Sequence, residues 1–460
     1  MTIASGEAGT RRIRPCGRTA VLLGLVVVLA FVIRIDLLRN TAAPIPPAPA
    51  VSDAAAYRLL GQGIADGEGY VRPFDRQRDG VRIATAEYPP GYPLLLAAAA
   101  TVGITDETGQ RILLCGVGAL TVGLIGLVAR RLGGDGAGLI AAGVAALHPA
   151  LWSTDTSPLA EPLAACLGTG VVLVALAVYD RPRPERWLLL GALAGLGGLV
   201  RTELLLMGVL LVVPLALQRV PGRRARLVAV ALGLGAMGAV LAPWTIRNWV
   251  TFERIVPVSN NAGSVARGAN CDRAYQGEFR ALWVTNVADV GGEEVDPDGQ
   301  CFTGFDVTAE RNEAEAAGEL RDAGLAYARE HAGELPGVAA ARVGRTVGLY
   351  RFDQQVNFAS FEGRTARWDR WGTRLFQALA LVGAAGAVAP WRGRGGPRWV
   401  LAVPLVAVLV TVISTYGNYR FRAVADPAVV VLAALAVVDA AARMAPRRAG
   451  SMTERQVRPD

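Results

Sequence analysis

The sequence predicts an all-α polytopic membrane protein, a helix bundle with about ten transmembrane helices and extracytoplasmic loops that carry juxtamembrane helices. Of the 460 residues, 52% are hydrophobic, and apolar stretches recur along most of the chain instead of gathering into one core. All 47 positively charged residues are arginine. They lie in short clusters between the apolar stretches, where cytoplasmic retention and anionic lipid explain them. We therefore expect membrane lipids, and no nucleic acid, among the partners.

The first apolar stretch follows four arginines and has no small-residue cleavage site, which indicates an uncleaved span rather than a signal peptide. Residues 93–104 are apolar but short, which favours an interfacial or re-entrant helix. The expected spans cover residues 20–38, 112–129, 137–152, 162–179, 187–200, 204–217, 227–244, 375–389, 399–414 and 428–442. Some of them fall short of the roughly 20 residues that usually cross a bilayer.

The distribution of arginine decides the topology. If residues 93–104 do not cross, every later arginine cluster between spans lies on the same side as the basic N-terminus. Both termini are then cytoplasmic, with a tail at residues 1–19 and a disordered tail at residues 443–460. An arginine-only chain rich in Ala, Gly and Val suggests a GC-rich bacterial genome, and hence the bacterial inner (plasma) membrane.

This topology divides the rest of the chain into three parts. Residues 20–244 form the transmembrane catalytic module, which includes a first outer loop at residues 40–110. Residues 245–374 form a large extracytoplasmic loop, and residues 375–442 form the C-terminal transmembrane helices. Within the large loop, charge and apolar spacing predict surface helices at residues 310–330 and 338–350.

Cys271 and Cys301 are the only cysteines expected outside the membrane and the cytoplasm. In an oxidising exterior they can pair and close a 30-residue loop. In the chain-entropy model such a bond stabilises the fold by about 3–4 kcal/mol. Two free thiols are the alternative.

The candidate site residues all fall on the extracytoplasmic side. For any single arginine there, anchoring at the membrane interface is an equal alternative. Glu161 begins a span, where it complements the helix dipole or orients an acceptor, a metal or a partner arginine. The candidates are Asp53, Tyr57, Glu87, Tyr88, Glu161, Arg201, Glu203, Arg247, Arg420 and Arg422.

Asp53 is the candidate general base. It opens an expected helix directly after Ser52, where an N-cap role is compatible with catalysis. The four-residue spacing places Tyr57 on the same helix face. Glu87 and Tyr88 lead into a stiff proline-rich turn, which either serves loop rigidity alone or holds these two side chains over a cleft.

Together these motifs resemble a family: the polytopic lipid-linked-sugar glycosyltransferases with the GT-C fold, specifically bacterial relatives of dolichyl-phosphate-mannose protein mannosyltransferase and of lipid A aminoarabinose transferase. The chain departs from the pattern in having a single acid at Ser52-Asp53-Ala54, where many relatives carry two adjacent acids, and Asp426 where relatives often have Glu. The likeness is carried by Asp53 with Tyr57, Tyr88–Pro93, Ala160–Pro162, Val200–Glu203, Pro243–Trp249, Val256–Gly263, Tyr419–Arg422 and Asp426–Pro427.

The resemblance implies an inverting transfer of a mannose- or arabinose-like sugar from a polyprenyl-phosphate donor to a protein, glycolipid or glycan acceptor. Asp53 would take the acceptor proton. The arginines at outer span ends, Arg201, Arg247, Arg420 and Arg422, would meet the donor phosphate. The acceptor would be oriented by Tyr57, Glu87, Tyr88, Glu161 and Glu203.

No cofactor is expected. The absence of a second acid adjacent to Asp53 favours metal-independent transfer, with a divalent metal left open. The rival function is a lipid or solute transporter or flippase, which would show mid-membrane acids, broken helices and an internal repeat. The nearly uncharged span interiors favour chemistry at the outer rim over transport. A catalytically silent scaffold of the same fold is a third possible function.

Overall fold

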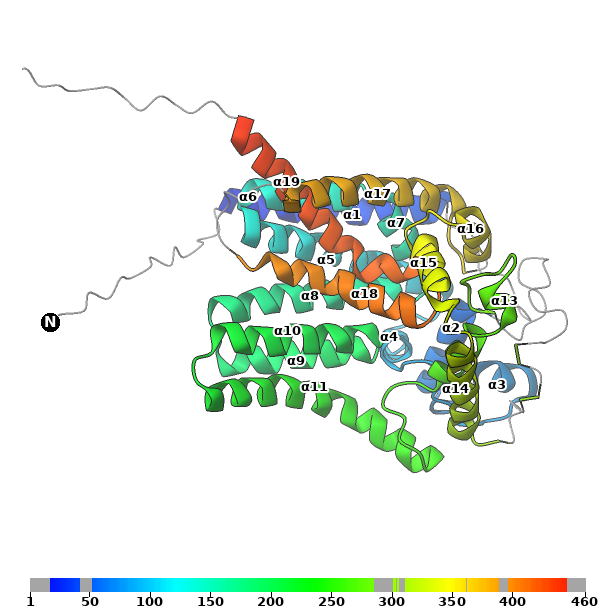
Figure 1. Cartoon of the computed structure of the whole chain (residues 1–460). Helices are drawn as coiled ribbons and strands as arrows, with labels where there is room; N and C mark the ends of the chain where they lie inside the picture. The colour runs from blue at the N-terminus through cyan, green and yellow to red at the C-terminus, as the bar shows by residue number, and fades with distance from the viewer. Residues whose placement is uncertain are drawn as a thin grey trace, which may run out of the picture.

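The computed structural model describes residues 17–41, 52–284, 301–302, 304–305, 311–360, 362–388 and 396–444. Both expected tails, apart from residues 17–19 and 443–444, lie outside the described residues. Within these ranges the regular structure is helical, with one isolated bridge between Val71 and Ala84. Figure 1 shows the long helices bundled side by side, with shorter helices gathered at one end. The expected all-α class is confirmed.

Each expected span coincides with helical structure. Five described helices, α1, α5, α8, α11 and α19, have the length and hydropathy to cross a membrane, and the bent pair α6–α7 is a sixth if it forms one span. The protein is thus multi-pass, whereas the count of ten is not confirmed. The helices are α1 (Gly17–Thr41), α5 (Glu107–Gly133), α6 (Asp135–Ala146), α7 (Pro149–Asp155), α8 (Glu161–Asp180), α9 (Pro184–Gly198), α10 (Glu203–Arg219), α11 (Arg223–Phe252), α17 (Ala366–Val388), η1 (Arg398–Leu401), α18 (Ala402–Ser414) and α19 (Asp426–Met444).

The span expected at residues 137–152 is broken rather than continuous. Helices α6 and α7 meet at an angle of 60°. The break follows from Pro149 at the start of α7, because a proline disfavours helical backbone at the residue before it. His148 accordingly has extended backbone, with φ −84° and ψ 112°.

Small residues let the membrane helices pack closely. A Cβ atom added to Gly191 of α9 would lie 1.8 Å from the backbone oxygen of Gly233 in α11. Without a hydrophobic driving force between helices in lipid, such close backbone approach is what holds helix pairs together. Figure 1 shows α8, α9, α10 and α11 running alongside one another as a result.

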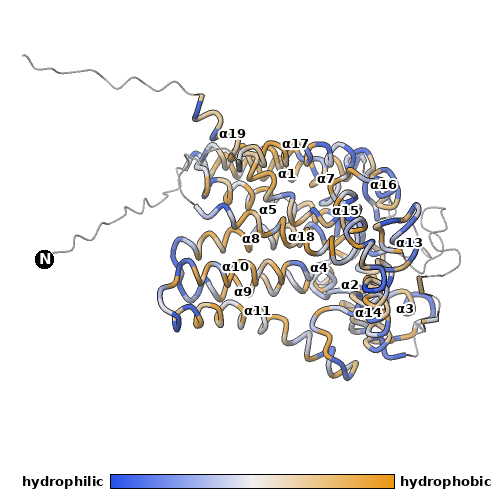
Figure 2. Tube along the Cα trace, viewed as in Figure 1, coloured by the Kyte–Doolittle hydropathy of each residue, from blue (hydrophilic) through white to orange (hydrophobic). Residues whose placement is uncertain are grey.

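The shorter helices form the outer end of the molecule, where Figure 2 shows hydrophilic residues concentrated around α3, α13, α14 and α16. The surface helices expected at residues 310–330 and 338–350 appear as α14 and α15, the second of them shifted towards the N-terminus. The elements of this end are α2 (Asp53–Ala65), α3 (Pro73–Asp79), α4 (Gly91–Ala100), α12 (Asn261–Gly268), α13 (Asp272–Tyr275), α14 (Glu313–Glu330), α15 (Leu335–Thr346), α16 (Phe352–Ser360) and η2 (Tyr419–Val424).

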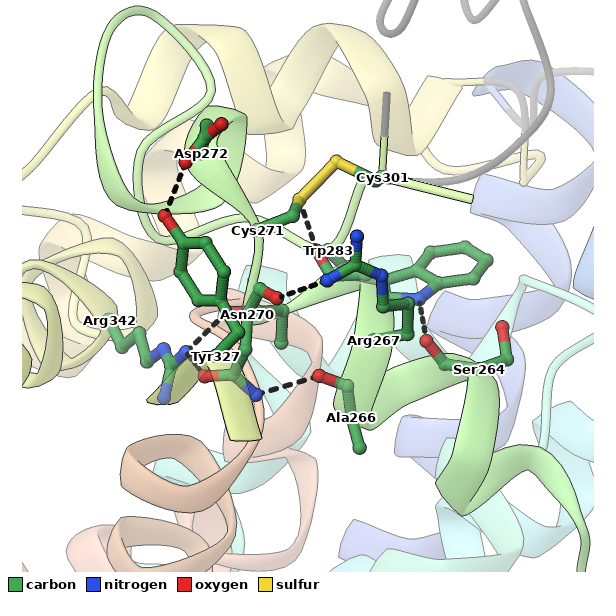
Figure 3. Close-up of a disulfide and its surroundings, with 12 residues drawn as sticks. Ser264, Ala266, Arg267, Asn270, Cys271, Asp272, Trp283, Cys301, Tyr327 and Arg342 are labelled. Atoms are coloured by element: carbon green, nitrogen blue, oxygen red, sulfur yellow. Dashed lines mark hydrogen bonds between the residues drawn. A yellow bond between two sulfur atoms is a disulfide. The ribbon is translucent and has the colours of Figure 1, made fainter. Parts of the chain in front are cut away.

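The expected disulfide is present within residues 245–374. Cys271 and Cys301 are bonded, with Cα atoms 5.5 Å apart (Figure 3). Beside them, Tyr327 of α14 donates a hydrogen bond of 2.6 Å to Asp272. Arg342 of α15 donates to the Ala269 carbonyl at 2.6 Å and to a carbonyl of α18 at 2.7 Å. These bonds fasten the outer loop to the end of the bundle.

Candidate functional site

Asp53 lies at the first turn of α2, but Ser52 is the residue that caps the helix. The Ser52 hydroxyl accepts a hydrogen bond from the Ala55 amide at 3.2 Å. The amides of Asp53 and Ala54 donate to the two carboxylate oxygens of Glu362, at 3.2 and 3.0 Å. Because the helix start is satisfied by these other groups, the Asp53 carboxylate is not used as a cap. Its side chain is 40% exposed.

Arg420 joins Asp53 to two further carboxylates. The short helix η2 begins at Tyr419, directly after its N-cap residue Asn418, whose side chain accepts a hydrogen bond from the Arg420 amide at 2.9 Å. The Arg420 guanidinium lies 3.1 Å from Asp53, 2.9 Å from Glu161 and 3.7 Å from Glu362. One planar cation with donors in three directions can serve three acids in this way.

Arg201 is the second cation at the site. It lies in the turn between α9 and α10 and contacts Glu161 at 3.0 Å and Glu203 at 2.6 Å. The guanidinium also stacks over the Phe421 ring, 5.0 Å from its centroid. The Glu161 side chain is only 1% exposed, and two arginines converge on one of its oxygens. Glu161 thus acts as the shared anchor that places Arg201 and Arg420 side by side.

Two tyrosines complete the surroundings of Asp53. The Tyr88 hydroxyl donates to the second Asp53 oxygen at 3.3 Å. The Tyr57 ring packs edge-on against Tyr88 and Tyr92, with centroid distances of 5.1 Å. The turn at Tyr88–Pro93 is held by a hydrogen bond of 2.7 Å from the Gly91 amide to the Leu199 carbonyl. The Tyr88–Pro93 motif therefore connects α2 to the turn that carries Arg201.

The remaining sequence candidates lie away from this cluster. Arg247 donates to the carbonyl oxygens of Thr85 and Tyr70, at 2.7 and 2.9 Å, and so fastens α11 to the first loop. Arg422 is buried, donates to Thr373 at 3.1 Å and lies over an aromatic ring of α17. Glu87 is exposed and neighbours the cluster through Tyr88. The structure brings Arg201 and Arg420 to Asp53, but not Arg247 or Arg422.

Glu362 is a site residue that the sequence did not reveal. It lies 309 residues from Asp53 along the chain, so no local spacing links the two. Burial and the nearby Asp53 carboxylate raise the pKa of Glu362 to about 7. Burial lowers the pKa of Arg420, but Glu161, Asp53 and Glu362 together raise it well above its ordinary value. Arg420 is therefore a permanent cation.

The cluster combines four carboxylates with two guanidinium groups: Asp53, Glu161, Glu203 and Glu362 with Arg201 and Arg420. The Arg420 guanidinium lies among Asp53, Glu161 and Glu362, so these three carboxylates are not free to converge on a metal ion. Among the described residues, no three His, Cys, Asp or Glu side chains are placed to hold a metal ion. What the cluster offers chemically is one open carboxylate beside two fixed cations.

A family model connects this site with known proteins. Residues 87–246 match the model of dolichyl-phosphate-mannose-protein mannosyltransferases. The matched segment includes Tyr88, Glu161, Arg201 and Glu203. It does not extend to Asp53 or Arg420. No curated protein matches the chain.

Solved structures of the Archaeoglobus fulgidus oligosaccharyltransferase are similar at 13–14% identity. The apo form gives a TM-score of 0.48, covering 92% of this chain and 50% of that one. The complex of AglB with an inhibitory peptide and a dolichol-phosphate gives 0.46, covering 91% and 50%. The chain thus spans about half the length of these structures, and a likeness at this level carries no argument about activity. The family model match confirms, over residues 87–246, the resemblance to dolichyl-phosphate-mannose-protein mannosyltransferases that the sequence motifs indicate.

Proposed function

We propose that the protein is an inverting glycosyltransferase that moves a mannose- or arabinose-like sugar from a polyprenyl-phosphate donor to an extracytoplasmic acceptor. The observation that carries the proposal is the position of Asp53. Its side chain is 40% exposed, whereas those of Glu161 and Glu362 are 1% and 14% exposed. Asp53 is thus the carboxylate of the cluster that an incoming hydroxyl group can reach, and Tyr88 and Arg420 fix its orientation.

In the proposed reaction the acceptor oxygen attacks the anomeric carbon as the bond from that carbon to the phosphate oxygen breaks. The proton of the acceptor hydroxyl passes to Asp53, and the polyprenyl phosphate leaves with the electron pair of the broken bond. Attack opposite the leaving group inverts the anomeric carbon. Arg201 and Arg420 stabilise the negative charge that grows on the phosphate, an effect commonly worth about 3 kcal/mol per donor.

The location of the cluster supports a lipid-linked donor. Asp53 begins α2, Arg201 lies between α9 and α10, and Arg420 lies in η2, between α18 and α19. Figure 2 shows α2 beside the hydrophilic end of the molecule. A polyprenyl tail stays in the bilayer, so its phosphate is presented at the level of the lipid headgroups. The family whose model matches residues 87–246 is named for a dolichyl-phosphate sugar.

Two features favour a transporter or flippase as the second candidate. The α6–α7 pair is a broken helix, and Arg34 of α1 forms a buried ion pair of 2.7 Å with Asp155 of α7. Broken helices and buried charges recur in transporters.

Sugar transfer by purified, reconstituted protein tests the proposal. The donors are radiolabelled polyprenyl-phosphate mannose and arabinose, offered with a crude envelope acceptor. Wild type is expected to transfer label, and Asp53→Asn to lose about 100-fold or more of the rate, the usual contribution of a general base. Asp66→Asn, at the other end of α2, is the matched control and keeps the wild-type rate.

The outcomes separate the candidate functions. Undiminished transfer by a folded Asp53→Asn variant would refute the role of Asp53. Failure of wild type to transfer from either donor, together with movement of donor lipid between leaflets, would favour the flippase instead. A hexose or pentose preference follows directly from which donor is used.

A further inference from the structure

A groove of about 650 Å³ lies between α14 and the segment that follows α11. Its size is within the range of roughly 300–1,000 Å³ typical of ligand sites. One wall is α14, which contributes Glu315, Glu319 and Asp322. The spacing of four and three residues places these acids on one face of the helix. The other wall includes Arg254, Ser259 and Asn260.

Each acid of this wall is paired with an arginine. Glu315 contacts Arg254 at 2.8 Å, Glu319 contacts Arg311 at 2.7 Å, and Asp322 contacts Arg321 at 2.8 Å. The three pairs carry no net charge. Exposed pairs of this kind contribute little to stability, but they present planar donors and acceptors to whatever enters the groove.

The groove is built onto the segment that carries Tyr88. The Ser259 hydroxyl donates to the Glu87 carbonyl, and the Asn260 amide donates to the Ala86 carbonyl at 2.8 Å. Glu313, at the start of α14, accepts from the Ala86 amide at 2.7 Å. The next residue after Glu87 is Tyr88, which donates to Asp53. Residues 86–88 therefore link the groove to the proposed base, because Ala86 and Glu87 bond to its walls and Tyr88 bonds to Asp53.

We propose that this groove binds an uncharged oligosaccharide acceptor, whose end is thereby presented to Asp53. The proposal rests on the proposed glycosyltransferase function and names its acceptor class. Sugar hydroxyls both donate and accept hydrogen bonds, and the paired carboxylates and guanidinium groups supply both kinds of partner. Because the pairs cancel in charge, the groove offers no excess of positive charge that would favour an anionic lipid or a strongly acidic peptide.

Gly318 offers a way to fill the groove without disturbing the fold. It lines the groove in the middle of α14, and a Cβ atom added there meets nothing within 4 Å. Gly318→Trp therefore places a large ring in the open space. Arg329→Trp, at an exposed position near the end of the same helix, is the matched control.

The experiment measures transfer from polyprenyl-phosphate mannose to mannotetraose and to methyl mannoside. Gly318→Trp should raise KM for the tetrasaccharide about tenfold or more, a loss that corresponds to about 1.4 kcal/mol of binding. Its kcat and its KM for methyl mannoside should stay within about twofold, because the short acceptor needs only the site at Asp53. Arg329→Trp should match wild type in all of these values.

Calorimetric binding of mannotetraose separates the two proposals. If wild type transfers nothing yet binds the tetrasaccharide, and Gly318→Trp does not bind it, the groove stands and the proposed function fails. An unchanged KM for mannotetraose in Gly318→Trp would overturn the proposed acceptor site. An equal rise of KM for methyl mannoside would also overturn it. Tighter binding of a charged acceptor peptide than of mannotetraose would also overturn it.

The double variant Arg254→Ala/Glu315→Ala guards against misfolding of Gly318→Trp. It removes one exposed ion pair from the groove and leaves the net charge unchanged. It should also raise KM for the tetrasaccharide alone. A double variant with the wild-type KM for mannotetraose counts against the proposal.

Discussion

At the scale of single residues, the site is organised around Arg420. One guanidinium contacts Asp53, Glu161 and Glu362, three acids that come from distant parts of the chain. Arginine suits this position because its nitrogens point in fixed, different directions, whereas a lysine presents one compact charge. The orientation of the proposed base therefore depends on the shape of this cation as well as on its charge.

Arg420→Lys tests that dependence. The variant keeps the positive charge but cannot contact all three acids, so we expect sugar transfer to fall by about tenfold or more. Arg78→Lys, at an exposed position on α3, should retain the wild-type rate. Equal rates for Arg420→Lys and wild type would show that charge alone is sufficient.

Glu362 should make the stability of the protein depend on pH. Its pKa is raised from 4.5 to about 7 by burial and by Asp53, with Arg420 opposing the shift. The folded state therefore binds this proton more tightly than the unfolded state does. The resulting stabilisation is fully present below pH 4.5 and is lost as the pH rises to about 7.

Glu362→Gln cannot titrate and should lack this contribution. Apparent unfolding temperatures measured in detergent at several pH values between 4.5 and 8 provide the comparison. Wild type should lose more of its unfolding temperature across this interval than Glu362→Gln loses. Parallel curves for the two proteins would contradict the assignment.

At the scale of elements, the Tyr88–Pro93 turn connects the first loop to the bundle. Gly91 begins α4 against the turn between α9 and α10, where an added Cβ atom would lie 2.8 Å from the Leu199 carbonyl oxygen. Tyr88 on one side of this contact and Arg201 on the other both belong to the site. A change in this contact therefore alters the site without touching a charged group.

Gly91→Ala should destabilise the protein by about 1–3 kcal/mol, the usual cost of overpacking, and should lower transfer. Gly116→Ala in α5 is the matched control, because its Cβ atom meets nothing within 4 Å. There the loss of unfolded-state freedom should leave stability unchanged or slightly higher. Chemical or thermal unfolding in detergent measures both variants. A neutral Gly91→Ala would mean that the turn can shift.

At the scale of the whole molecule, the proposed function requires the site to face the exterior. The arginine clusters between spans predict that the turn before α11 is cytoplasmic, while α14 lies outside. Arg224 and Arg329 are both exposed and belong to these two regions. Among the described residues, the free cysteines Cys115 and Cys166 are buried. With Cys16 replaced by serine in both variants, background labelling should be low.

We expect a membrane-impermeant maleimide to label Arg329→Cys in intact cells and to label Arg224→Cys only after the cells are opened. Total labelling in denaturant normalises the two variants. Labelling of Arg224→Cys in intact cells would reverse the topology and place Asp53 in the cytoplasm. The proposed function would then need a donor presented on the inner face.

The all-α class and the approximate positions of the apolar helices could be predicted from the sequence alone. Apolar periodicity, arginine clusters and capping residues act over a few turns of helix and can be read locally. For the same reason, Asp53, Glu161 and Arg201 were identifiable as residues at helix starts and turns. The break at His148 also has a local cause, Pro149. The sequence nevertheless predicted one continuous span there, because the apolar stretch runs across the break.

Only the tertiary structure decided which of these residues meet. Arg201 and Arg247 are both arginines that the sequence places at the ends of expected spans. Arg201 nevertheless pairs with Glu161, whereas Arg247 binds backbone carbonyls of residues 70 and 85. Glu362 joins Asp53 across 309 residues. The physical reason is that the strength of a charge–charge contact depends on separation in space and on burial. Both quantities arise from the packing of the whole bundle and not from any spacing along the chain.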